Sequence, residues 1–285
     1  MALDLVWGTA LIAALALLLF VATARLVRHL PGSALGILGL AAVAALFLYI
    51  RSIWYDVRLA QWLPFSNLIV LGNWLPLFAA VLAGLTWERT RGHTWRRTFF
   101  AGGMGLTALY ALVHPMVGSA PQCENRWDWM GNCLQTTNYT CSAASAATLL
   151  KAHGIEASEQ EMAELCLTRH GTSWQGLYRG LKLKTARTKW DVEVVACSTQ
   201  ELAQLTQGPM IISVGLDASA PGDTDFTREF GWIPGVNHSV ILHGFTPYGS
   251  AVISDPTQEL CREQWNEETL RVLWRGYAIR LVKRS

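Results

Sequence analysis

The chain has 285 residues, of which 51% are hydrophobic and only 15% are charged, and its formal net charge is +2. This length allows about two domains. The small net charge and the lack of a basic stripe interleaved with aromatic residues argue against a nucleic-acid partner. The long apolar runs lie in the first 120 residues, so we predict a membrane domain over 1–120 and a globular domain over 121–285.

Four apolar stretches make up the first part of the chain, at 5–24, 34–50, 68–85 and 99–117. Each approaches the roughly 20 residues that a helix needs to cross the hydrocarbon core. The first stretch lacks the basic start and the small-residue cleavage site of a signal peptide, so we interpret it as a span. The sequence therefore predicts an integral membrane protein with four transmembrane helices in the lipid bilayer.

Basic residues in the connecting loops predict the orientation of these helices. Arg25 and Arg28 follow the first stretch, four arginines lie between 89 and 97, and no Lys or Arg follows the fourth stretch before Arg126. The loop over 51–58 has mixed charge. Because basic loops favour the cytoplasmic side, we expect the globular domain to be extracytoplasmic.

Six cysteines lie in the globular part. Cys123 and Cys133 bracket a segment rich in tryptophan, and in an oxidising compartment paired cysteines form disulfides, so we suspect a bridge between these two. The sequence alone cannot assign a further pair among Cys166, Cys197 and Cys261.

Three helices are predicted at the start of the globular part. Small residues and leucines follow Cys141 and stop at Gly154, which is the pattern of a helix that ends at a glycine. Ser158 with Glu161 three residues later predicts a second helix that opens with a capping box. A third, shorter pattern covers 174–183, with Thr172 or Ser173 as its cap.

Strands are predicted after the helices, at 192–195, 210–214, 238–245, 251–254 and 276–281. The turn residues at 247–250 join two of these runs into a hairpin. Helices followed by antiparallel strands indicate an α+β domain with a helical layer against the sheet.

The hairpin and the first helix bring together residues suited to nucleophilic catalysis. Cys141 lies in the first turn of its helix, where unpaired N–H groups and the helix dipole favour a thiolate. In the hairpin, His238 begins one strand beside Asp255, which ends its partner, so the pair supplies a base and a group that orients it. Gln135 lies six residues before Cys141 and can offer a side-chain N–H to an oxyanion, with the Cys141 backbone N–H as the second donor.

Each of these residues also has an ordinary structural interpretation. A cysteine can be a buried apolar residue, a histidine can lie on a strand surface, an aspartate can cap a turn and a glutamine can lie in a loop. Among the other histidines, His243 is expected on the opposite face of the sheet. His153 and His170 lie in the helical part without an acidic partner.

The ordered set Gln, Cys, His and Asp resembles the C39 peptidases and the wider C39-like branch of papain-like cysteine peptidases. The segments at 171–177, 208–211, 237–245 and 253–256 are also similar to that family, and the resemblance covers about 133–281. It implies a papain-like fold in which Cys141 is the nucleophile, His238 the general base, Asp255 the orienting residue and Gln135 the oxyanion donor. The family usually has Asp-Cys-Gly at the nucleophile, where this chain has Thr140-Cys141-Ser142.

The resemblance implies a cysteine-type peptidase, a thiol protease that needs no cofactor or metal and cleaves a peptide or protein substrate through a thioester. The four predicted spans would place it in the bacterial inner or cell membrane, and this topology suggests a substrate close to the membrane. The sequence has no Walker A motif, so ATP-driven export is not carried over from the transporter members of the family. Two alternatives stay open: a catalytically idle peptide-binding or scaffolding domain, and a transpeptidase or transacylase that uses the same thioester.

Overall fold

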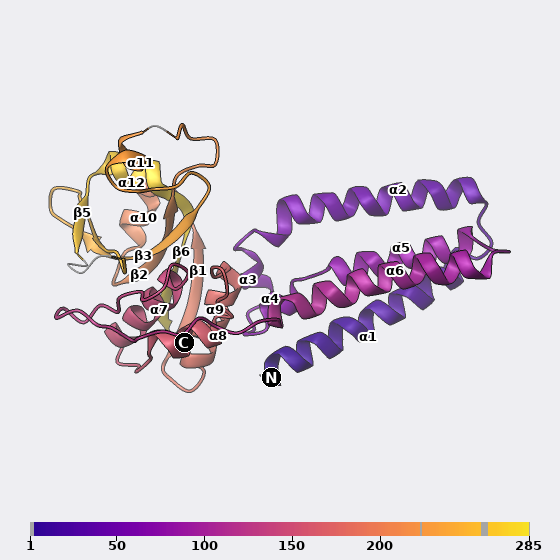
Figure 1. Ribbon diagram of the computed structural model, residues 1–285, viewed down its shortest axis with the longest axis horizontal. Coiled ribbons are helices and arrows are strands. Elements are labelled where there is room, and N and C mark those ends of the chain that lie inside the picture. The colour runs from indigo at the N-terminus through magenta and orange to yellow at the C-terminus, as the bar shows by residue number, and fades with distance from the viewer. Residues whose placement is uncertain (1–2, 223, 258–261, 285) are drawn as a thin grey trace. The chain divides into compact units, whose positions relative to one another are not determined.

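The computed structural model describes residues 3–222, 224–257 and 262–284. The chain divides into two compact units, Met1–Val117 and Gly118–Ser285, which are described separately (Figure 1). Cys261, one of the three candidates for a second disulfide, lies outside the described residues.

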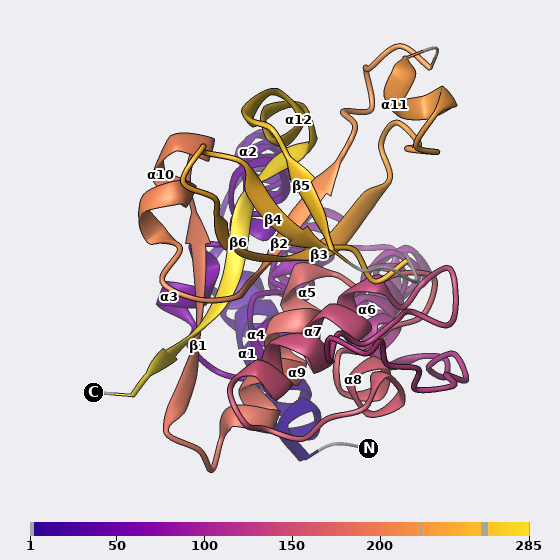
Figure 2. The same ribbon diagram turned by 90° about the vertical axis from the view of Figure 1, so that its left-hand side faces the viewer.

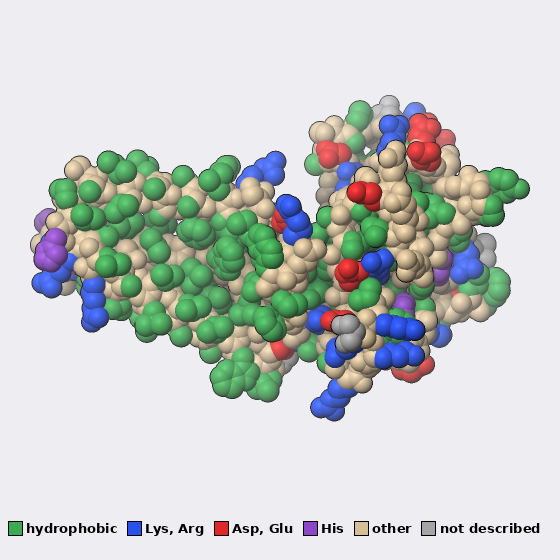
Figure 3. Space-filling view, turned by 180° about the vertical axis from the view of Figure 1, so that it is seen from behind, with side chains coloured by type: hydrophobic (Ala, Val, Ile, Leu, Met, Phe, Trp, Pro, Cys, Tyr) green, Lys and Arg blue, Asp and Glu red, His purple; other side chains and the backbone are tan. Residues whose placement is uncertain are grey.

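The N-terminal unit is helical. Four helices in it are long and apolar enough to span a membrane, which confirms the four predicted stretches as helices. Hydrophobic side chains cover most of the face of this unit seen in Figure 3. Its elements are α1 (Leu3–Leu26), α2 (Gly32–Tyr49), the π-helical turn η1 (Ile50–Trp54), α3 (Leu59–Trp62), α4 (Leu68–Leu71), α5 (Leu75–Arg89), α6 (Thr94–Val113) and the 3₁₀ turn η2 (His114–Met116).

The third predicted stretch is a helical span, Leu68–Arg89, with a break near its start. It is divided into α4 and α5 around Gly72 and Asn73, with Pro76 in the first turn of α5. The Tyr49 hydroxyl donates to the Gly72 carbonyl and accepts from the Trp74 N–H, and the Asn73 side chain donates to the Ala111 carbonyl at 2.8 Å. These partners replace the helical hydrogen bonds lost at the break, which an apolar environment would otherwise leave unsatisfied.

The two basic loops lie at the same end of the N-terminal unit. One cavity of about 450 Å³ is lined by Arg25 in the last turn of α1, Arg28 just after it, Arg91 and Arg97 around the start of α6, and Glu88. Because α1 and α5 end at this cavity, the arginines of the first and third loops share one end of the helices.

The C-terminal unit is an α+β fold, as predicted, with a helical layer against an antiparallel sheet. Its sheet has the strand order β1-β6-β2-β3-β4-β5, and every neighbouring pair is antiparallel. Its elements are α7 (Cys141–Ala152), α8 (Glu159–Leu165), α9 (Trp174–Thr185), β1 (Trp190–Ala196), α10 (Thr199–Leu205), β2 (Met210–Gly215), α11 (Asp225–Arg228), β3 (Asn237–Phe245), β4 (Ala251–Ser254), β5 (Glu263–Trp265), α12 (Glu267–Leu273) and β6 (Trp274–Lys283).

Alternation along β3 separates the two faces of the sheet. The Ser239 hydroxyl and carbonyl bond two serines of α7, at 2.8 and 3.0 Å, so Ser239 faces that helix. Its neighbour Val240 points the other way. There it packs with Leu202 of α10 and Leu270 of α12 in a core of fully buried side chains. Figure 2 shows α7, α8 and α9 grouped together, away from α10 and α12.

Two cap predictions have different outcomes. The Ser158 hydroxyl accepts from the Glu161 N–H at 3.1 Å as expected, but the Glu161 carboxylate bonds Lys184 of α9 at 2.9 Å rather than returning to the cap. The predicted capping box is therefore only half formed. For the third helix, Ser173 is the cap, and its hydroxyl accepts from the Gly176 N–H.

The suspected Cys123–Cys133 bridge is wrong, because Cys123 carries a free thiol. The two residues are held by different helices. The Cys123 N–H donates to Gln160 of α8 at 2.8 Å, and the Cys133 N–H donates to Thr148 of α7 at 2.8 Å.

Candidate active site

Cys141 is the first residue of α7, as the sequence predicts. The small residues that follow it are buried, so this helix is embedded in the unit and its start is fixed in place. Thr140 occupies the cap position without a side-chain cap bond, and its hydroxyl donates instead to the Thr137 carbonyl at 3.1 Å. The N–H groups of the first turn therefore keep their capacity to stabilise negative charge at Cys141.

His238 and Asp255 come together as the predicted hairpin requires. Nε2 of His238 lies 2.9 Å from Oδ1 of Asp255, and the two side chains are 16% and 8% exposed. Thr246 and Ser250 close the turn through a backbone bond of 2.8 Å, so the start of β3 lies opposite the end of β4. With Nε2 engaged by the carboxylate, Nδ1 is the ring nitrogen left for the thiol.

Cys141 and His238 interact, and their pKa values move in opposite directions. Burial alone raises the pKa of the Cys141 thiol, but the hydrogen bond and positive charge of His238, with further bonds from the Ser239 N–H and the Ser142 hydroxyl, hold this pKa below its ordinary value. Burial alone lowers the pKa of His238, but its bonds to Asp255 and Cys141 raise this pKa well above its ordinary value. The pair is thus biased toward thiolate and imidazolium.

Asp255 is held in its charged form by its neighbours. Burial raises the pKa of this carboxyl group, but bonds from His238 and from the backbone and hydroxyl of Thr257 lower it below its ordinary value. The two Thr257 bonds measure 2.8 and 2.5 Å. The carboxylate is therefore fixed and charged beside the imidazole.

Gln135 is tied to the strand that carries Asp255. Its backbone N–H donates to the Pro256 carbonyl at 2.8 Å, which joins the loop before α7 to the segment after β4. The side-chain oxygen of Gln135 is buried without a hydrogen-bond partner among the described residues.

Three further residues at the site were missed by sequence reasoning. The Trp232 ring lies edge-on to His238 at 5.9 Å, and Thr257 holds Asp255. Burial raises the pKa of Tyr277 on β6, a bond with Ser213 lowers it, and the negative charge of Cys141 raises it. Only Thr257 had a local signal, as a hydroxyl residue two positions after an aspartate.

The other histidines have separate environments. Nε2 of His243 lies 2.8 Å from the Ser254 hydroxyl, and burial followed by the charge of Arg262 lowers the pKa of His243 to about 4. His153 bonds the Leu149 carbonyl through Nδ1, and the His170 ring packs against Tyr139. Among the histidines that the structure describes, His238 is the one joined to both a carboxylate and a thiol.

This arrangement has the parts needed for acyl transfer. A thiolate at a helix start can attack a carbonyl carbon, an imidazolium can give a proton to the leaving group, and a buried carboxylate can hold the imidazole in one orientation. In the described part of the chain, no group of three or more His, Cys, Asp or Glu side chains is arranged to hold a metal ion.

A family model described as "Peptidase_C39 like family" matches residues 123–278. This match includes Gln135, Cys141, His238 and Asp255. No curated protein matches the chain at significant similarity.

Several solved structures are similar to the C-terminal unit at low identity. The peptidase domain of Streptococcus ComA, a bi-functional ABC transporter involved in a quorum sensing pathway, is 19% identical with a TM-score of 0.42, covering 53% of this chain and 96% of that chain. A double glycine motif protease from an AMS/PCAT transporter, in complex with the leader peptide, is 16% identical with a TM-score of 0.41, covering 58% and 95%. A periplasmic domain of the EpsAB fusion protein of the Vibrio vulnificus type II secretion system is 19% identical with a TM-score of 0.32, covering 51% and 47%.

Proposed function

Because the chain belongs to the Peptidase_C39 like family, we propose that it is a membrane-anchored cysteine peptidase with Cys141 as its nucleophile. The observation that carries this proposal is the pairing of His238 with Asp255 at 2.9 Å beside Cys141 at the start of α7. In this proposal residues 1–120 form the membrane domain and 121–285 the peptidase domain.

The reaction begins with attack of the Cys141 thiolate on the carbonyl carbon of a peptide bond. The carbonyl oxygen becomes an oxyanion, which the Cys141 backbone N–H and the Gln135 side-chain amide stabilise. The His238 imidazolium gives its proton to the leaving amine as the carbon–nitrogen bond breaks, and a thioester remains. Water, deprotonated by His238, then attacks the thioester, and the acid product leaves as Cys141 returns to the thiolate.

Asp255 acts on His238 throughout this cycle. Its carboxylate accepts from Nε2, which keeps Nδ1 turned to the thiol and stabilises the imidazolium. Asp255 is thus a positioning residue that does not exchange a proton with the substrate.

The basic loops support a proposal for the side of the membrane on which the peptidase domain lies. Both arginine-rich loops lie at one end of the N-terminal unit, and such loops favour the cytoplasm. In this proposal, the peptidase domain is extracytoplasmic in a bacterial cell membrane, and its substrate is a peptide or protein near the bilayer surface.

The test uses the full chain in detergent and a mixture of internally quenched peptides. We expect cleavage by the wild-type chain, loss of cleavage in Cys141→Ala, and little change in the matched control Cys197→Ala, which removes a thiol outside the site. An iodoacetamide probe at neutral pH should label Cys141 before the other thiols. Cleavage by Cys141→Ala at the wild-type rate would exclude this nucleophile, and selective labelling without any cleavage would favour an idle peptide-binding domain.

A further inference from the structure

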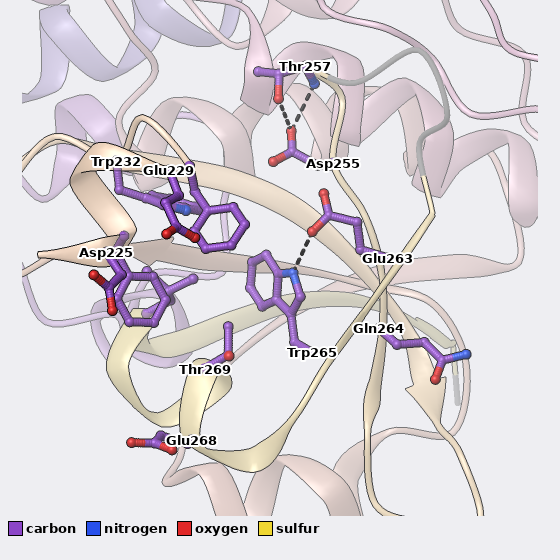
Figure 4. Close-up of a pocket in the computed structure, with 13 residues that line it drawn as sticks. Asp225, Glu229, Trp232, Asp255, Thr257, Glu263, Gln264, Trp265, Glu268 and Thr269 are labelled. Atoms are coloured by element: carbon purple, nitrogen blue, oxygen red, sulfur yellow. Dashed lines mark hydrogen bonds between the residues drawn. The ribbon is translucent and has the colours of Figure 1, made fainter.

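A pocket of about 650 Å³ lies beside the candidate active site and shares Asp255 with it (Figure 4). Its walls come from the segment around α11, from β5 and from α12, and Thr257 lies at its border with the site. This volume is in the range of pockets that hold a side chain or a small ligand.

The charged side chains that line this pocket are all acidic. Its described lining contains no Lys or Arg but five carboxylates: Asp225, Glu229, Asp255, Glu263 and Glu268. Two of the five are already engaged, because Asp225 pairs with Arg228 at 3.2 Å and Asp255 bonds His238. Glu229, Glu263 and Glu268 form no ion pair with any described residue.

Glu263 gives the most direct indication of a ligand. Its Oε2 accepts from the Trp265 indole N–H at 2.7 Å, while its Oε1 is buried and has no hydrogen-bond partner in the described part of the chain. A buried carboxylate oxygen without a partner is costly. A cationic donor in the pocket would satisfy it.

Aromatic side chains complete the walls. The rings of Trp232 and Trp265 meet edge to face with centroids 6.2 Å apart, and Phe226 and Phe230 line the same space. Aromatic faces attract cations and also pack well against the aliphatic stem of a long basic side chain. An acidic ligand would be repelled by the carboxylates, and a purely apolar one would leave Glu263 Oε1 unpaired.

The pocket is connected to the catalytic residues through two side chains. Trp232 contacts His238 on one side and Trp265 on the other, and the Asp255 carboxylate borders both spaces. In Figure 4 the carboxylates of Glu229, Asp255 and Glu263 surround the space beside Trp265. A substrate that extends from Cys141 past His238 and Trp232 would bring one of its side chains to this pocket.

We propose that this pocket selects substrates by binding an arginine or lysine side chain next to the scissile bond. The proposal rests on the peptidase function proposed above and names its substrate class. Glu263 is the principal partner of the cation, and Glu229 and Glu268 add negative charge at the opening.

The first experiment does not depend on cleavage. Benzamidine, and its neutral analogue benzamide, are titrated into the full-length Cys141→Ala chain in detergent by calorimetry. We expect benzamidine to bind at least about tenfold more tightly, because a charge-assisted hydrogen bond forms only with the cation. Glu263→Gln should remove most of this preference. Glu267→Gln, a neighbouring acidic residue of α12 outside the pocket lining, should keep it.

A second variant guards against a folding defect in Glu263→Gln. The double change Glu229→Gln and Glu268→Gln alters two exposed side chains, leaves the Glu263–Trp265 bond intact, and should reduce the preference several-fold. Equal binding of benzamidine and benzamide to the Cys141→Ala chain would overturn the proposal. An equal loss in Glu267→Gln would also overturn it.

The second experiment separates this proposal from the peptidase function. Quenched peptides that differ only in arginine against citrulline, or lysine against norleucine, are offered to the wild-type chain. We expect at least about tenfold faster cleavage of the basic member of each pair, and loss of that difference in Glu263→Gln. Cleavage without a preference would overturn the pocket assignment and leave the peptidase proposal standing. Benzamidine binding without any cleavage would support the cation site and count against the peptidase.

Discussion

At the scale of single residues, the coupling of Cys141 with His238 decides the chemistry of the site. Burial favours the neutral form of both groups, and their interaction with each other and with neighbours such as Asp255 reverses this. The thiols of Cys123 and Cys166 lie in a different environment. Burial raises the pKa of Cys123 to about 11 and that of Cys166 to about 12.

A labelling experiment tests this contrast. At pH 6.5 we expect iodoacetamide to modify Cys141 at least about tenfold faster than Cys123 or Cys166, because only Cys141 is held as a thiolate. His238→Ala removes the hydrogen bond and the positive charge and leaves burial, which raises the pKa of the thiol. Labelling of Cys141 at pH 6.5 should then fall about tenfold or more and return as the pH rises. Mass spectrometry of each cysteine gives the rates, and unchanged labelling in His238→Ala would contradict the coupling.

Asp255 should act on the thiol only through His238. Asp255→Asn keeps a side chain that can bond the imidazole but removes the negative charge that raises the pKa of His238. Less imidazolium then faces Cys141, so the midpoint of Cys141 labelling against pH should move upward by about one pH unit. The shift should be smaller than that of His238→Ala. Asp217→Asn, an exposed aspartate outside the site, serves as the control, and a midpoint unmoved by Asp255→Asn would argue against the positioning role.

The same shifts determine how acid and base affect stability. The folded pKa of Asp255 is lowered, so its contribution is present at neutral pH and is lost as the pH falls through that folded pKa. The pKa of His238 is raised, so its contribution is present below the ordinary histidine range and is lost as the pH rises through its folded value.

At the scale of elements, close helix packing in the C-terminal unit depends on glycine in α9. A Cβ atom at Gly176 would lie 2.3 Å from the Cys166 carbonyl oxygen, which belongs to the backbone that ends α8 and cannot turn aside. Gly180 has a similar role one turn later, where a Cβ would meet the Cys166 sulfur.

Gly176→Ala should therefore destabilise the fold by about 1–3 kcal/mol, the usual cost of overpacking. Thermal unfolding of the full chain in detergent measures this as a lower Tm. Gly208→Ala is the matched control, because a Cβ there has no neighbour within 4 Å, and its Tm should stay near the wild-type value. Equal Tm values for both variants would show that α8 and α9 can separate at little cost.

The helices and strands that could be predicted from the sequence are those whose turn or end is marked by residues next to them in the chain. The β3–β4 hairpin follows from its turn, and α7 follows from small residues that end at Gly154, whose φ is +74°. In contrast, β5 has three residues and no apolar alternation, so nothing local predicts it. A complete capping box forms at Ser198 and Glu201 of α10, where the serine and the glutamate have the same spacing as Ser158 and Glu161.

Part of the candidate site can also be predicted from neighbouring residues, and part cannot. The pairing of His238 with Asp255 belongs to the first part, because the hairpin alone brings these two residues together. The approach of Cys141 to His238 depends on the packing of α7 against β3, which neighbouring residues do not specify. It could be predicted only from the resemblance to a known family. Trp232 comes from the long segment between β2 and β3, and the pocket needs this segment beside β5, which no pattern in the sequence indicates.

At the scale of the whole molecule, the orientation in the membrane is the property most open to direct test. The arginines of the first and third loops predict that these loops are cytoplasmic and that residue 285 is outside. Alkaline phosphatase fused after Ser285 should be active, whereas a fusion after Arg91 should be inactive, because this reporter needs an oxidising compartment to form its disulfides. Green fluorescent protein fused at the same two positions should give the reverse pattern, and an inactive phosphatase after Ser285 would place the peptidase domain in the cytoplasm.

The free thiols of Cys123, Cys141, Cys166 and Cys197 have a consequence for the protein in the extracytoplasmic location proposed above. None of these four holds the fold together by a covalent bond, so reducing agents should leave the C-terminal unit folded. A thiolate such as Cys141 is, however, the form that peroxide oxidises first, to a sulfenic acid. The proposed nucleophile is thus also the residue most sensitive to oxidation. An extracytoplasmic enzyme of this kind would need a supply of reductant to restore its activity.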